Sequence, residues 1–200
     1  MDKQMIEDTS GSVSGIKNIG LILVGICAIT LGAKIQIPFW PVPMTLQTLA
    51  IFLVASGLGL RLGLATIIGY LVVGFAGLPV FAGYAAGPAY FAGPTAGFLF
   101  GFIALVSLVG YADQRRLMKG PVSRFAVFIV ADIACFLFGL AWLAYGYPLS
   151  SGGNGIGAAA AFSAAVMPFI LGDVLKAGIA AMSIAGNHKI REYLANIKNG

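Results

Sequence analysis

The chain has 200 residues, of which 59% are hydrophobic and only 10% are charged, with a formal net charge of +5. Its mean hydropathy is +0.94. A soluble domain has about a quarter of its residues charged, so this composition excludes an ordinary soluble protein and predicts a multi-pass membrane protein in contact with lipid. The basic residues lie in short clusters between apolar runs. Membrane topology explains this pattern better than nucleic-acid binding does, and we expect no nucleic-acid partner.

Six apolar segments predict membrane helices, because a span needs about 20 apolar residues and about 17 at the least. The second and third form a tight hairpin that turns at residues 57–61. Pro168 breaks the last apolar stretch, so we expect a short re-entrant or tilted helix over 157–166 before the final span. The fold class is an all-α membrane protein, a compact bundle of six transmembrane helices in one domain, 19–187. The expected spans are 19–37, 44–60, 62–76, 95–111, 125–145 and 169–185.

The distribution of Lys and Arg predicts the orientation of the bundle. The connections 38–43, 77–94 and 146–156 contain neither residue, whereas the chain ends and the other connections contain several. Cytoplasmic segments are enriched in Lys and Arg. We therefore expect a bacterial or similar plasma membrane, with the polar N-terminus (1–18) and the C-terminus (188–200) in the cytoplasm.

The extracellular connection 77–94, which we call the lid, lies in an uncharged stretch, GLPVFAGYAAGPAYFAGPTAG, that extends to residue 97. Its glycines and prolines make a regular helix improbable. Irregular backbone at membrane depth survives only where it is buried in protein or lines a cavity. The lid is therefore predicted to cover a site for a small molecule. Its aromatic residues are Phe81, Tyr84, Tyr90 and Phe91.

Polar groups at the outer ends of the spans are candidates for binding that molecule. Asp173 and Lys176 are three residues apart, so they share one helix face near the lid. They form either an ion pair that orients the helix or a joint contact to a polar ligand. Gln47 has more donors and acceptors than one backbone carbonyl can satisfy. Its neighbours Thr45 and Thr48 are ligand contacts or only bond their own helix.

Other intramembrane residues have simpler expected roles. Asp132, near the middle of the fifth span, is expected to be structural, and Lys34 can extend to the interface. Cys27 and Cys135 are expected to be small packing residues, and His188 to be solvated. The sequence has no P-loop, metal-ligand cluster or Ser-His-Asp set, so we expect no catalytic residue, metal or cofactor.

A row of small residues marks the first span. Gly25, Ala28 and Gly32 are spaced three and four apart. Small residues in this register allow another helix to approach closely. The partner helix belongs either to this chain or to a second membrane protein.

Three stretches together resemble the signature regions of the BioY family, the substrate-binding S components of biotin transporters of the energy-coupling-factor (ECF) type. They are IPFWPVPMTLQTLA, GLPVFAGYAAGPAYFAGPTAGFLFGF and PFILGDVLKAGIAA, in a resemblance that runs from about residue 32 to 181. It implies a six-helix protein that captures biotin from outside. It also implies a membrane coupling protein and two cytoplasmic ATPases as partners, although some members of the family are thought to work without them.

The resemblance also implies roles for individual residues. The family's acidic and basic positions in the last span match Asp173 and Lys176, and its glutamine in the second helix matches Gln47. Asp173 and Gln47 would bond the ureido group of biotin, with Thr45 beside them. Lys176, or else Lys34, would meet the carboxylate, and the reverse orientation is also open. The ring system would be covered by Phe81, Tyr84 and Tyr90.

Rival functions remain open. One is an S component for a different small vitamin. Another is a membrane-embedded enzyme that uses Asp132 and Asp173 as an acid/base pair, but the two are expected on different helices at different depths. A channel is disfavoured because the polar residues gather near the outer side.

Overall fold

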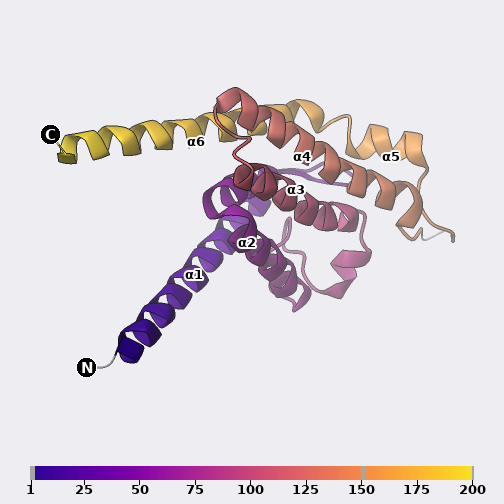
Figure 1. Ribbon diagram of the computed structural model, residues 1–200. Coiled ribbons are helices and arrows are strands. Elements are labelled where there is room, and N and C mark those ends of the chain that lie inside the picture. Colours follow the sequence, from indigo (N-terminus) through magenta and orange to yellow (C-terminus); the bar gives the residue numbers. More distant parts are fainter. Residues whose placement is uncertain (1–2, 150–151, 200) are drawn as a thin grey trace.

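The structure, a computed structural model, describes residues 3–149 and 152–199, with side chains for 15–149 and 152–184. Most of the chain is helical (Figure 1). A 3-10 helix η1 (Pro88–Ala92) lies in the lid, a π-helical turn η2 (Trp142–Gly146) extends α4, and two short antiparallel strands, β1 (Gln36–Ile37) and β2 (Met44–Thr45), precede α2. The α-helices are α1 (Lys3–Lys34), α2 (Gln47–Phe75), α3 (Ala96–Gln114), α4 (Pro121–Ala141), α5 (Ala158–Ala165) and α6 (Ile170–Asn199).

The 29 residues of α2 do not form one straight helix. At Gly59 the backbone enters a left-handed conformation (φ 71°) that favours glycine. The side chains of Gln47 and Tyr70 are hydrogen-bonded at 2.8 Å, although their Cα atoms would lie about 35 Å apart in a straight helix. The two arms of α2 therefore run antiparallel, and the reversal lies inside the turn predicted over 57–61.

The second break in the chain is the turn 166–169, which contains Pro168. It separates α5 from α6, and the two helices meet at an angle of 51°. The helix α5 occupies the segment predicted as a short re-entrant or tilted helix. Among the described residues, four single helical segments are long and apolar enough to cross a membrane, and a fifth is added if the bent α5–α6 pair counts as one span. With α2 folded into two arms, the chain builds the predicted bundle of six transmembrane helices.

At both ends of the bundle, α1 and α6 continue into the polar segments 1–18 and 188–200. Neither segment contains proline, so nothing in them breaks the helical hydrogen bonding. The two helices carry the chain ends away on the same side of the molecule (Figure 1). The side chain of His188 lies outside the described residues.

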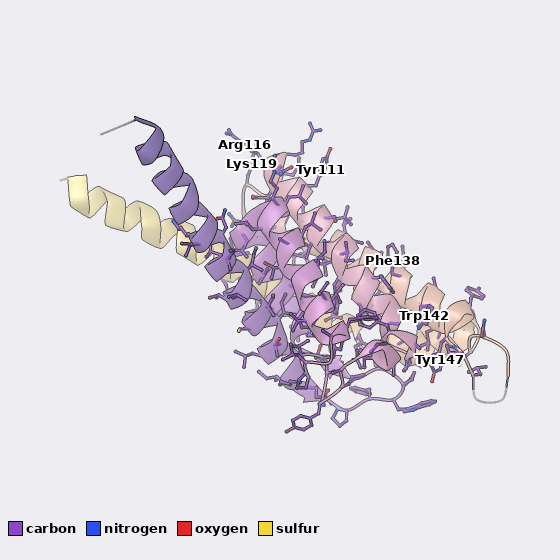
Figure 2. All side chains as sticks on the ribbon, turned by 90° about the horizontal axis from the view of Figure 1, so that it is seen from below. Tyr111, Arg116, Lys119, Phe138, Trp142 and Tyr147 are labelled. Atoms are coloured by element: carbon purple, nitrogen blue, oxygen red, sulfur yellow. The ribbon has the colours of Figure 1, made fainter. Side chains whose placement is uncertain are left out.

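The charged and uncharged connections lie at opposite ends of the bundle. Figure 2 places Tyr111, Arg116 and Lys119 at the end nearer the chain termini, and Trp142 and Tyr147 toward the other end. Aromatic residues at both ends suit the two membrane interfaces. Large apolar side chains are exposed along the helices between these ends, where lipid would contact them.

Close helix contacts hold the bundle together. A Cβ at Gly101 of α3 would lie 2.8 Å from the carbonyl oxygen of Cys135, so only glycine allows α3 and α4 to approach this closely. Phe52 of α2 stacks on Phe128 of α4 with ring centroids 4.6 Å apart. These contacts place the core where α2, α3, α4 and α6 meet.

The small residues of α1 pack mainly against this same chain. A Cβ at Gly25 would lie 2.7 Å from the methyl group of Thr66, and one at Gly32 would lie 3.0 Å from the carbonyl oxygen of Leu46. Both glycines therefore let α2 approach α1. Ala28 is half-buried and borders, with the two glycines, an apolar groove between these helices. Contact of this row with a second membrane protein stays a prediction.

Candidate ligand-binding site

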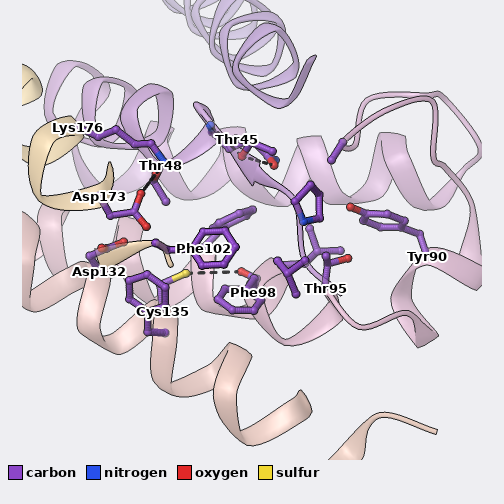
Figure 3. A pocket seen from close by; sticks show the side chains of 17 residues that line it. Thr45, Thr48, Tyr90, Thr95, Phe98, Phe102, Asp132, Cys135, Asp173 and Lys176 are labelled. Atoms are coloured by element: carbon purple, nitrogen blue, oxygen red, sulfur yellow. Dashed lines mark hydrogen bonds and ion pairs between the residues drawn. The ribbon is translucent and has the colours of Figure 1, made fainter. Parts of the chain in front are cut away.

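A cavity with about 560 Å³ of empty space lies beneath the lid, between β2, the start of α2, α3, α4 and α6 (Figure 3). Apolar and aromatic side chains form much of the wall, and polar groups gather at one end. The lining residues are Val42, Pro43, Thr45, Gln47, Thr48, Ala82, Tyr90, Thr95, Phe98, Leu99, Phe102, Asp132, Cys135, Phe136, Phe169, Asp173 and Lys176.

The polar end is organised around the carboxylate of Asp173. Its Oδ1 atom accepts a hydrogen bond from Lys176 Nζ at 2.6 Å and another from Thr48 Oγ1 at 2.9 Å. Asp173 lies in the first turn of α6, directly after the break at Pro168, where the helix dipole favours a negative charge. Asp173 and Lys176 are 4% and 7% exposed. Asp173 and Lys176, which were predicted to share one helix face, therefore form an ion pair, and both line the cavity.

A chain of hydrogen bonds connects the cavity wall to the lid. Gln47 Nε2 donates to the hydroxyl of Tyr70 at 2.8 Å, and that hydroxyl donates to the carbonyl oxygen of Val80 at 3.0 Å. Thr45 Oγ1 donates to Gln47 Oε1 at 3.2 Å. Gln47 and Thr45 thus lie in the cavity wall, and the amide donor of Gln47 is used within the protein.

Two of the three aromatic residues predicted to cover the ligand form the inner side of the lid. Tyr90 lines the cavity, and burial raises the pKa of its phenol, which therefore stays protonated. Phe81 stacks on Tyr90 with centroids 4.6 Å apart and is fully buried behind it. Beneath the Phe81 ring, Gly74 of α2 leaves no room for a Cβ atom, and its carbonyl accepts a hydrogen bond from the amide of Gly87 at 2.8 Å.

The third aromatic residue, Tyr84, lies elsewhere. It is 93% exposed and does not line the cavity, in contrast to its predicted position over the ligand. The chain turns at Gly83 (φ 65°), and the Tyr84 ring lies 5.7 Å from the ammonium group of Lys34. The turn of the lid backbone, which no sequence periodicity predicts, directs this ring outward.

Lys34 also lies outside the cavity. Its ammonium group donates to the carbonyl oxygens of Pro79, Phe81 and Gly83, the second of these at 2.8 Å. An ammonium group has three donors, and all three are directed at the lid backbone. Lys34 therefore holds the lid to the end of α1 and does not serve as the alternative cation of the site.

Asp132 is the main residue whose position was predicted wrongly. It lines the same cavity as Asp173, and Figure 3 shows the two carboxyl groups as neighbours, although different depths were expected. The start of α6 packs against the middle of α4, so both carboxyl groups reach the same cavity. Carboxyl groups are rare inside membrane spans, and this rarity is the feature of the sequence that points to a role for Asp132 in the cavity.

Two hydroxyl groups and a thiol complete the wall. Thr48, one residue after Gln47, bonds Asp173, and Thr95 Oγ1 is buried without a partner among the described residues. Cys135 is buried in the wall and Cys27 is exposed, and both are free thiols. Within residues 15–149 and 152–184, no three His, Cys, Asp or Glu side chains come together as metal ligands would.

This site suits a small ligand with an apolar body and a polar head that both donates and accepts hydrogen bonds. Such a site, beneath a lid at one end of a six-helix bundle, defines the class: a multi-pass membrane protein with a cavity suited to a small ligand. The family model for the BioY family matches residues 3–193. The chain belongs to the BioY family.

Individual relatives agree with this assignment. The chain is 32% identical over 166 residues to the probable biotin transporter BioY of Pyrococcus horikoshii, covering 83% of this chain and 93% of the relative. It is 34% identical over 164 residues to the biotin transporter BioY of Thermotoga maritima, covering 81% and 91%. Its fold is similar to the crystal structure of the S-component for biotin from an ECF-type ABC transporter, with a TM-score of 0.72, 23% identity and coverage of 88% and 93%.

Proposed function

We propose that this chain binds biotin in the cavity beneath the lid and is the substrate-binding subunit of a biotin uptake system. The observation that carries the proposal is the buried Asp173–Lys176 pair, with Thr48, at the polar end of a mostly apolar cavity. Relatives that share about a third of the sequence are named biotin transporters. Binding and release, with no catalytic step, is the activity proposed.

The ureido group of biotin matches the polar end of the cavity. It has two N–H donors and one carbonyl acceptor. A carboxylate beside an ammonium group offers the complementary acceptor and donor, so an N–H binds Asp173 while the carbonyl accepts from Lys176. The apolar thioether ring then lies against Phe98, Phe102 and Tyr90 of the wall.

The carboxylate of biotin is placed at the outer rim, under the lid. Lys176 is already neutralised by Asp173, and Lys34 is bound to the lid backbone. An anion at the inner end would therefore lack a cation, which is expensive in a buried site. At the rim, the unpartnered hydroxyl of Thr95 and the protonated phenol of Tyr90 supply hydrogen-bond donors.

We further propose that a membrane coupling protein and two cytoplasmic ATPases energise uptake, with ATP used by those subunits. The absence of a nucleotide-binding motif in the sequence supports an external energy source. The proposed orientation places the lid outside and both termini in the cytoplasm. Two observations support this orientation. The two chain ends lie on one side of the molecule, and the connections without Lys or Arg lie on the other.

The test is thermal stabilisation of the purified protein by a panel of vitamins, followed by calorimetric titration. A ligand present at 100 times its Kd stabilises the folded state by about 2.7 kcal/mol. Biotin is expected to raise the Tm, while thiamin, riboflavin and nicotinic acid leave it unchanged. If one of these three vitamins stabilised the protein and biotin did not, that vitamin would be the ligand instead of biotin.

The site itself is tested by Asp173→Asn and Lys176→Ala. Both variants are expected to lose biotin binding measured by calorimetry. Wild-type affinity in both would exclude the polar end of this cavity as the binding site, even if biotin is the ligand.

A further inference from the structure

Asp132 is a buried carboxyl group that takes no part in the Asp173–Lys176 ion pair. It lies in the middle of α4, is 5% exposed and lines the ligand cavity. Asp173, its neighbour, accepts hydrogen bonds from an ammonium and a hydroxyl group. In the part of the chain whose side chains are described, no hydrogen-bond donor contacts Asp132.

The other side of Asp132 borders an apolar groove. This groove has about 820 Å³ of empty space between α4, α5 and α6, and its other lining residues are all apolar. Asp132 and Phe136 belong to both linings, so they separate the groove from the cavity. An ionised carboxylate at this boundary would face hydrocarbon on one side, where charge is least tolerated.

The charges of the site favour a neutral Asp132. The groups that face it are Asp173 and Lys176 from α6 and Cys135 from its own helix, with Tyr90 from the lid lining the same cavity. The residues that α2 and α3 contribute to this cavity have no ionisable side chain. Lys176 and Asp173 already balance one another, so an ionised Asp132 would leave one uncompensated negative charge. Repulsion between two neighbouring carboxylates, here Asp132 and Asp173, favours protonation of one of them.

We propose that Asp132 is a ligand-binding residue that contacts the ligand as a neutral carboxylic acid. It donates its O–H to the ureido carbonyl, which has a second lone pair beside the one that faces Lys176. Asp173 keeps its ammonium and hydroxyl partners, and it accepts from the ureido N–H. The proton stays on Asp132, so no net proton transfer occurs. This assignment rests on the proposed binding of biotin.

The test is calorimetric titration of biotin into wild type, Asp132→Asn, Asp132→Ala and the exposed control Asp113→Asn. Asparagine keeps the shape and a donor of the neutral acid, so Asp132→Asn is expected within about threefold of wild type at neutral pH. Alanine removes the donor and should weaken binding about tenfold or more. The control removes a carboxylate at the end of α3 and should bind like wild type.

The pH profile separates this role from a merely structural one. With rising pH, wild-type affinity is expected to fall once Asp132 loses its proton, by up to about tenfold per pH unit. Deprotonation removes the donor and adds a charge. Asp132→Asn has no such proton and should show no such fall, whereas Asp113→Asn should follow wild type.

Several results would overturn this assignment alone. They are the same pH profile in wild type and Asp132→Asn, wild-type affinity in Asp132→Ala, or loss of binding in folded Asp132→Asn, which would mean that the ionised form is needed. No biotin binding by wild type at any pH would instead overturn the proposed function, and with it this role of Asp132.

Discussion

Lys34 contacts the lid and Lys176 lies in the cavity wall, and these two lysines have different roles. Lys34, at the last turn of α1, donates to three backbone carbonyls of the lid and remains exposed. Lys176 is buried and pairs with Asp173 at 2.6 Å in the cavity wall. Backbone carbonyls as partners fix the shape of a loop, whereas a carboxylate partner inside a cavity prepares charged groups for a ligand. The partner, and not the residue type, therefore distinguishes the two roles.

The two lysines also differ in what their removal leaves behind. Loss of Lys34 leaves neutral carbonyls that water can reach, because this side of the lid is exposed. Loss of Lys176 leaves the Asp173 carboxylate alone in a buried site, and breaking such a pair costs about 3–5 kcal/mol. The predictions below test this difference.

The largest effect is expected for Asp173→Asn. The substitution leaves a buried ammonium group without its counterion and removes the acceptor of the cavity, so biotin affinity should fall more than about 100-fold. Calorimetric titration measures the loss, and Asp113→Asn serves as the matched control. An affinity within a few-fold of wild type would show that the pair serves only to hold α6.

A double substitution separates stability from binding at the same pair. Lys176→Ala alone should lower the Tm, because it leaves an unpaired carboxylate. Adding Asp173→Asn removes that charge, so the Tm should recover while binding stays lost, since replacing a whole buried pair is often neutral for stability. If the double variant were no more stable than Lys176→Ala, the two side chains would not act as a pair.

A smaller effect is expected for Lys34→Ala, which releases the lid from α1. Biotin should dissociate about tenfold faster, since three hydrogen bonds from an ammonium group no longer hold the lid. Hydrogen exchange of the lid amides should rise in the same variant. Lys17→Ala, an exposed lysine on the same helix, is the control. Unchanged exchange in the lid would mean that other contacts hold it closed.

The smallest effect is expected for Tyr84→Ala, with an affinity within about twofold of wild type, because an exposed side chain away from the site contributes little. Tyr90→Ala is the matched comparison inside the lid and should weaken biotin binding about tenfold, since it removes a stacked ring and a hydroxyl group from the wall. A large loss in Tyr84→Ala would indicate that the lid folds further over the ligand when it binds.

Much of this site could be predicted from the sequence, because it depends on short-range spacing. The interval of three residues places Asp173 and Lys176 on one face, and Pro168 marks the break that brings them beneath the lid. Asp132 could not be placed, because its position beside Asp173 depends on how α4 and α6 pack against each other. The roles of Lys34 and Tyr84 depend on the path of an aperiodic loop, which tertiary contacts with distant residues determine.

The close contact between Gly74 of α2 and Phe81 of the lid has a consequence for related sequences. The ring of Phe81 occupies the space that a side chain at position 74 would need. A family member with a larger residue at position 74 must therefore have a smaller one at position 81 to keep the same lid. The two positions are expected to covary across the family, even though neither lines the cavity.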